Sequence, residues 1–69
     1  MTVEITLKDG AFVEIEQVNK ILKLDLSGYK ATIENFDDFY LYPKVFYTFK
    51  SETSSVTLRS DDIHYVKFC

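Results

Sequence analysis

The sequence predicts an all-β domain, built as a small antiparallel barrel or a strongly curved sheet of five to seven strands with at most one short helical turn. Apolar and polar residues alternate with a period of two along most of the chain, which is the pattern of strands with one buried face. No window of about a dozen residues has the apolar spacing of an amphipathic helix. Turn-forming residues separate the alternating segments, as in antiparallel sheets with short connections.

The chain of 69 residues makes one domain, near the size at which a single apolar core is only marginally stable. A single cysteine, Cys69, excludes an internal disulfide, and no Cys or His spacing fits a metal site. We therefore expect added stability to come from a protein partner or from self-association, for example as a homodimer. We expect no cofactor. No leader-like or membrane-spanning apolar run is present, so we expect a cytoplasmic protein.

The first two predicted strands form a hairpin around the turn at residues 8–10, where Gly10 can adopt a positive φ. The strands cover residues 2–7 and 12–18, and each alternates apolar residues with Thr or Glu. The residues expected to face the core are Val3, Ile5, Leu7, Val13 and Ile15.

Two further strands are predicted over residues 21–26 and 29–36, with Ser27-Gly28 as the turn between them. The alternation changes phase at Asn19-Lys20, which is consistent with a bulge, a bend or a second hairpin. The residues expected on the inward faces are Leu22, Leu24, Leu26, Tyr29, Ala31 and Ile33.

Residues 35–49 hold seven aromatic side chains and are divided by Pro43. Because proline cannot donate to a central ladder, Pro43 separates two predicted strands. The side chains expected to face the core are Phe39, Leu41, Val45, Tyr47 and Phe49.

The opposite faces of these two strands predict an exposed aromatic patch, because Tyr40, Tyr42 and Phe46 alternate with the core positions. Exposed clusters of this kind mark interaction sites, and tyrosine is enriched in interface cores. We predict a partner-binding surface made of Tyr40, Tyr42, Lys44 and Phe46, with Asp37 and Asp38 presenting negative charge nearby. The alternative left open is that the sheet curls so that both faces are covered.

Two short strands are predicted at residues 56–59 and 63–68, after a polar loop at 51–55. Ser60-Asp61-Asp62 predicts a single helical turn between them, with Ser60 as its cap. His64 shares strand parity with Val66, which places it at the rim of the core. Leu58 and Val66 complete the expected core.

An enzyme is the least expected class, because the chain has one His, one Cys and no catalytic motif. The net charge of −3 and the lack of a basic run disfavour a nucleic-acid surface. Arg59, Lys50 and Lys67, together with Lys44, would form one only if the fold brought them together.

Two segments resemble the Sm-like RNA-binding family, whose members are small SH3-like barrels. LKDG at residues 7–10 resembles the turn of its first motif, and LRSDDIHYV at residues 58–66 resembles its closing strand pair. Arg59, Ile63 and Val66 stand where that family has an arginine and two apolar residues, and Ser60 replaces its glycine. The resemblance implies a ring of six or seven chains that binds single-stranded RNA.

In size, acidity and aromatic content the chain is also similar to small proteins encoded by phages and mobile elements, including anti-CRISPR proteins and other inhibitors. This resemblance implies a protein that acts by occupying a host protein surface. Our preferred hypothesis is a non-enzymatic protein-binding module that uses the aromatic patch or an exposed strand edge. A self-associating structural or assembly subunit is a third hypothesis.

Overall fold

The computed structural model describes the backbone of residues 1–69 and every side chain except that of Asp38. Seven strands confirm the all-β prediction, and two 3-10 turns exceed the single helical turn that was expected. The elements are β1 (Val3–Leu7), β2 (Phe12–Ile15), β3 (Lys20–Asp25), β4 (Lys30–Ile33), η1 (Phe36–Asp38), β5 (Val45–Lys50), β6 (Ser55–Arg59), η2 (Ser60–Asp62) and β7 (Ile63–Phe68). No helix of the described chain is long and apolar enough to cross a membrane.

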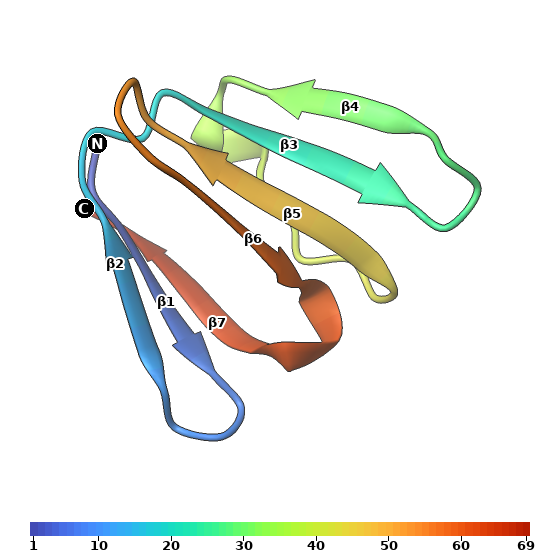
Figure 1. Cartoon of the computed structure of the whole chain (residues 1–69), viewed down its shortest axis with the longest axis horizontal. Helices are drawn as coiled ribbons and strands as arrows, with labels where there is room; N and C mark the ends of the chain where they lie inside the picture. The colour runs from blue at the N-terminus through green and yellow to red at the C-terminus, as the bar shows by residue number, and fades with distance from the viewer.

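The strands form two antiparallel sheets, with the orders β2-β1-β7 and β4-β3-β5-β6 (Figure 1). Residues 16–19 lead from one sheet into the other. The Val18 N–H donates to the Met1 carbonyl (2.8 Å) and the Asn19 N–H to the Lys50 carbonyl (2.9 Å). If β2 and β3 are counted as one bent strand, the order becomes β7-β1-β2/β3-β5-β6, with β4 also paired to β3. No ladder joins β6 to β7 in the described backbone, so the strands do not form a closed barrel.

The core is formed by the facing sides of the two sheets. Its buried apolar side chains are Val3, Ile5, Ile15, Val18, Ile21, Val45, Tyr47, Phe49 and Ile63. The inward face predicted for β5 is confirmed, since its alternate residues from Val45 to Phe49 are all buried. Half-buried residues that were expected in the core also pack against it, namely Leu7, Val13, Ile33, Leu58 and Val66.

The face of β3 that points inward is the opposite of the predicted one. Ile21 is fully buried, whereas Leu22 and Leu24 are half-buried and Leu26 is 75% exposed. The pairing with β5 is the cause, because Ile21 lies opposite the buried Phe49. Alternation along β3 then turns Leu22 and Leu24 toward the outer side of the sheet.

Residues 39–42 form a loop, which corrects the prediction of a strand before Pro43. Phe39 packs against the core as expected, but Leu41 is 38% exposed, because a loop does not keep the alternating orientation of a strand. Tyr29, which was also expected inside, lies in the turn before β4 and is 65% exposed.

A bulge in β7 moves His64 out of the predicted position at the rim of the core. Thr6 pairs with Tyr65, but the next residue of β1, Leu7, pairs with Ile63. The shift leaves His64 as the extra residue of the bulge. Ile63 is therefore buried and His64 is exposed.

The predicted helical turn at Ser60–Asp62 is present as η2, but Ser60 does not cap it. The cap position belongs to Arg59, and the buried Ser60 Oγ accepts the N–H of Val45 (3.1 Å). Asp61 Oδ1 accepts the N–H of Lys44 (3.3 Å). These two bonds tie η2 to the beginning of β5.

Replacing Ile21 with alanine tests the orientation of β3. Because Ile21 is fully buried, we expect its loss to lower the free energy of unfolding by about 2–4 kcal/mol. Leu24→Ala, on the outer side, should cost less than about 1.5 kcal/mol. Urea denaturation followed by tyrosine fluorescence measures both. A larger loss for Leu24→Ala than for Ile21→Ala would contradict the observed register.

Candidate protein-binding surface

Tyr40 and Tyr42 form an exposed aromatic pair on the loop between η1 and β5. Their side chains are 66% and 49% exposed, and their ring centroids lie 6.4 Å apart in an edge-to-face arrangement. The predicted exposure of both rings is therefore confirmed. Such a pair offers a large apolar contact area together with two polar hydroxyl tips.

The buried side chain of Tyr47 holds this loop in place. Its hydroxyl donates to the carbonyl oxygen of Tyr40 (2.7 Å) and accepts the N–H of Tyr42 (2.9 Å). Phe39, at the beginning of the loop, places its ring 5.2 Å from that of Tyr47 and 5.4 Å from that of Phe68. The backbone that carries the exposed tyrosines is thus fixed to the core at both ends of the pair.

Burial makes the Tyr47 hydroxyl a weaker acid than an ordinary tyrosine. Desolvation raises its pKa above the ordinary value of 10.0, and the hydrogen bond from the Tyr42 N–H opposes this effect. The neutral hydroxyl, which can both donate and accept, is therefore the form present around neutral pH. Both loop bonds require this form.

Lys23 supports the Tyr42 ring from β3, the strand beside β5. In β3 it lies opposite Tyr47, on the side of the strand that faces the core. An ammonium group cannot remain in an apolar interior, so the aliphatic stem runs outward and the Nζ atom lies 4.0 Å from the centroid of the Tyr42 ring. This cation–π contact restricts the orientation of Tyr42.

Phe46 lies on a different surface from the tyrosine pair, which corrects the prediction of one continuous patch. It is half-buried on the side of β5 opposite to the core, between Leu24 and Arg59 on the neighbouring strands. Lys44 lies in the turn directly before β5, has a positive φ of 60° and is exposed.

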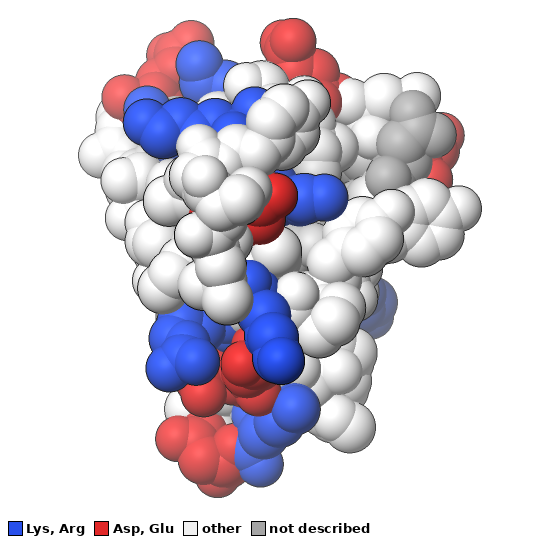
Figure 2. Space-filling model, turned by 90° about the vertical axis from the view of Figure 1, so that its right-hand side faces the viewer, with Lys and Arg blue, Asp and Glu red and all other residues white. Residues whose placement is uncertain are grey.

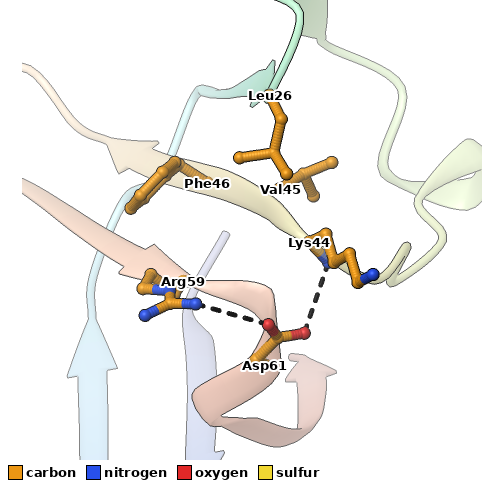
Figure 3. Close-up of a pocket in the computed structure, with 6 residues that line it drawn as sticks. All are labelled: Leu26, Lys44, Val45, Phe46, Arg59 and Asp61. Atoms are coloured by element: carbon orange, nitrogen blue, oxygen red, sulfur yellow. Dashed lines mark hydrogen bonds and ion pairs between the residues drawn. The ribbon is translucent and has the colours of Figure 1, made fainter.

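A shallow pocket at this end of the sheet brings Lys44 and Phe46 together, as predicted. Its lining is completed by Leu26, Val45, Arg59 and Asp61 (Figure 3). The one ion pair among the described side chains lies here and joins Arg59 Nη2 to Asp61 Oδ2 at 3.5 Å. Figure 2 shows basic and acidic side chains side by side below a band of uncharged ones.

The acidic residues predicted beside the aromatic patch lie in η1. Asp37 is exposed, and its N–H donates to Asn35 Oδ1 (3.1 Å), which caps the turn. Its carboxylate is therefore available next to the segment that leads to Tyr40. The side chain of Asp38 lies outside the described part of the structure.

The outer side of the β4-β3-β5-β6 sheet gathers basic residues that are far apart in the sequence. Cross-strand pairing places Lys30, Leu24, Phe46 and Arg59 in one row, and Lys20 and Lys50 in another. Two of the three residues predicted for nucleic acid, Lys50 and Arg59, thus share a face. The third, Lys67, belongs to the other sheet, where it lies opposite Glu4.

Sequence reasoning missed Lys20 and Lys30 as members of this face. The signal for Lys20 was its shared strand parity with Leu22 and Leu24, but that face was assigned to the inward side of β3. Only the pairing of β3 with β5 shows that this side faces outward.

No group of three or more metal-ligating side chains occurs in the described part of the chain. The thiol of Cys69 is exposed and donates to a carboxylate oxygen of Glu4 at 3.5 Å. Comparisons with protein-family models, curated proteins and solved structures gave no match. Function is therefore argued from the surfaces described above.

Replacing Tyr47 with phenylalanine tests how the loop is held. Because a carbonyl and an N–H lose their partner, we expect the free energy of unfolding to fall by about 1–3 kcal/mol. The raised pKa means that the folded state holds the Tyr47 proton more tightly than the unfolded chain. This stabilisation is complete below pH 10 and is lost as the pH rises above 10.0.

Urea denaturation between about pH 8 and about pH 11 should show the stability of the wild type approaching that of Tyr47→Phe at the alkaline end. Amide hydrogen exchange at Tyr42 should be faster in the variant. Unchanged exchange at Tyr42 would show that other contacts hold the loop.

Proposed function

We propose that the chain is a non-enzymatic module that binds a protein partner through Tyr40 and Tyr42, with Lys44 and Asp37 beside them. The observation that carries the proposal is that two exposed rings stand on a loop fixed to the core by the Tyr47 hydroxyl. A free surface loop pays conformational entropy when a partner orders it, and this loop is already ordered.

The composition of the surface also supports protein binding. A fully covered tyrosine buries roughly 150–250 Å², and tyrosine dominates the energetically important centres of interfaces. Lys23 keeps the Tyr42 ring oriented, and its ammonium group would lie near the rim of the proposed interface. The exposed Lys44 and Asp37 flank the pair in the sequence, and their opposite charges would favour one orientation of the partner.

The proposal extends to inhibition of a host protein in the cytoplasm. The similarity of the chain to small phage-encoded inhibitors supports this step, because occupying a functional surface of the target requires no catalytic group. The paired rings are suited to such a role, since they can fill an apolar depression on the target.

Replacing both tyrosines with serine tests the proposal. The partner is first captured from cell extract with the wild-type protein and identified, and its affinity is then measured by calorimetry. We expect Tyr40→Ser/Tyr42→Ser to weaken binding at least about tenfold, because the variant loses both anchors. The melting temperature should change little, since both rings are exposed.

The matched control is Tyr29→Ser, which removes an equally exposed ring from the turn before β4. It should leave the affinity unchanged. Equal affinity of the double variant and the wild type would refute the role of the tyrosine pair.

Single-stranded RNA binding is the second candidate. It is favoured by the shared outer face of Lys20, Lys30, Lys50 and Arg59, and by the resemblance to Sm-like proteins. Only one aromatic ring, that of Phe46, lies on this face, so base stacking has less support there than protein binding has at the tyrosine pair.

RNA binding predicts a salt-sensitive affinity for labelled oligouridine in fluorescence anisotropy. Lys50→Glu should weaken it at least about tenfold, because a phosphate contact is lost and a repulsive charge is added. The Sm-like form of this candidate also predicts a mass of six or seven chains. An affinity that Lys50→Glu does not change would exclude the basic face as the RNA site.

A further inference from the structure

The outer sides of the two sheets carry opposite charges. We call the outer side of the β4-β3-β5-β6 sheet the basic face, with Lys20, Lys30, Lys50, Arg59, Leu22, Leu24 and Phe46. We call the outer side of the β2-β1-β7 sheet the acidic face, with Glu4, Glu14, Phe12, Tyr65, Thr6 and Lys67. Neither face is covered by another part of the chain.

The basic face contains a cross-strand pair of like charges. Lys20 of β3 lies directly opposite Lys50 of β5. Like charges in this position destabilise a sheet. Within the described part of the chain neither lysine has a carboxylate in ion-pair distance. Next to this pair stand Leu22 and Thr48, and beyond them the apolar Leu24 and Phe46.

The acidic face contains the complementary pair. Glu4 of β1 lies directly opposite Glu14 of β2. The adjacent row contains Phe12 and Tyr65 on either side of Thr6, and these two rings are 57% and 52% exposed. Lys67 of β7 lies opposite Glu4 on its other side, so the row holds two carboxylates and one ammonium group, and the row with the two exposed rings follows it.

We infer that a second copy of this chain stacks its acidic face on the basic face of the first. On both sheets the next outward row lies two residues from the charged pair, which is about 6.8 Å along a strand. On the basic face this next row holds Leu22 together with Thr48. When Glu4 and Glu14 lie over Lys20 and Lys50, the row of Phe12 and Tyr65 therefore falls over that of Leu22. The Lys20–Lys50 pair gains attractive contacts with Glu4 and Glu14, and the exposed rings of Phe12 and Tyr65 are covered.

The contact is heterologous, because it joins two different faces. Pairing two basic faces would bring lysines together, and pairing two acidic faces would bring glutamates together. A heterologous contact leaves one free face at each end of a dimer, so association continues into a ring or an open chain of copies. A nucleic acid on the basic face would leave Glu14, whose cross-strand neighbour is Glu4, without a basic partner.

Light scattering behind size-exclusion chromatography tests the inference, at low ionic strength and in reducing buffer so that Cys69 does not crosslink chains. The wild type should show a mass that rises with concentration and falls with added salt. Lys50→Glu and Glu14→Lys should each weaken self-association at least about tenfold. Each variant puts opposite charges across its strand pair, so its melting temperature should not fall.

Two comparisons make the test specific. Lys8→Glu changes the net charge as Lys50→Glu does, but from an exposed turn, and should associate like the wild type. An equal mixture of Lys50→Glu and Glu14→Lys should form a dimer that grows no further, because one variant keeps the acidic face and the other the basic face. Tyr40→Ser/Tyr42→Ser should associate normally, which separates this inference from the proposed function.

A wild-type protein that stays monomeric at about 1 mM would overturn the inference, since contacts weaker than this lie outside the range of specific interfaces. Equal effects of Lys8→Glu and Lys50→Glu, or a mixture of variants that stays monomeric, would also overturn it. Salt-sensitive binding of oligouridine that is lost in Lys50→Glu, without any self-association, would assign the basic face to nucleic acid instead.

Discussion

The position of the aromatic loop over the core depends on the buried hydroxyl group of Tyr47. A phenol that is fully buried in an apolar core must find hydrogen-bond partners there, because an unsatisfied hydroxyl is costly. The partners are the carbonyl of Tyr40 and the N–H of Tyr42. Residues 40–42 must therefore lie over the core, and the side chains of this pair are left to point into solvent.

The same strand determines which surfaces β3 presents. Because Tyr47 and Phe49 face the core, their partners Lys23 and Ile21 must share that side. Lys23 then has to reach solvent around the edge of the sheet, where it meets the Tyr42 ring. Leu22, together with Lys20, is turned outward onto the basic face. The tyrosine pair and the basic face thus arise from one register.

Alternation predicts a strand correctly where one of its faces is apolar and the other is polar. In β1, Val3 and Ile5 alternate with Glu4, and both are buried as predicted. In β3 apolar residues occur on both faces, and the leucines favoured the wrong one. Only the long-range pairing of β3 with β5 decides between the faces, and such pairing is absent from a local pattern.

In the candidate site, too, the local pattern predicts some features, whereas long-range contacts decide others. The exposure of Tyr40 and Tyr42 followed from the sequence, although the predicted reason, strand alternation, was wrong. Their separation from Phe46 depends on a hydrogen bond to a buried side chain five residues further along. Likewise, the exposure of His64 depends on a bulge against β1, which no alternation within β7 indicates.

The two inferred surfaces reinforce each other. The tyrosine pair belongs to a loop, whereas the stacking contact uses only the outer faces of the sheets, so a copy bound at either face leaves Tyr40 and Tyr42 free. An assembly of several copies would then present several tyrosine pairs at fixed spacing. A partner with repeated sites would bind such an array more tightly than one copy, because after the first contact each further contact forms at a high effective concentration. For a chain of 69 residues, such an assembly would add both stability and affinity without a larger core.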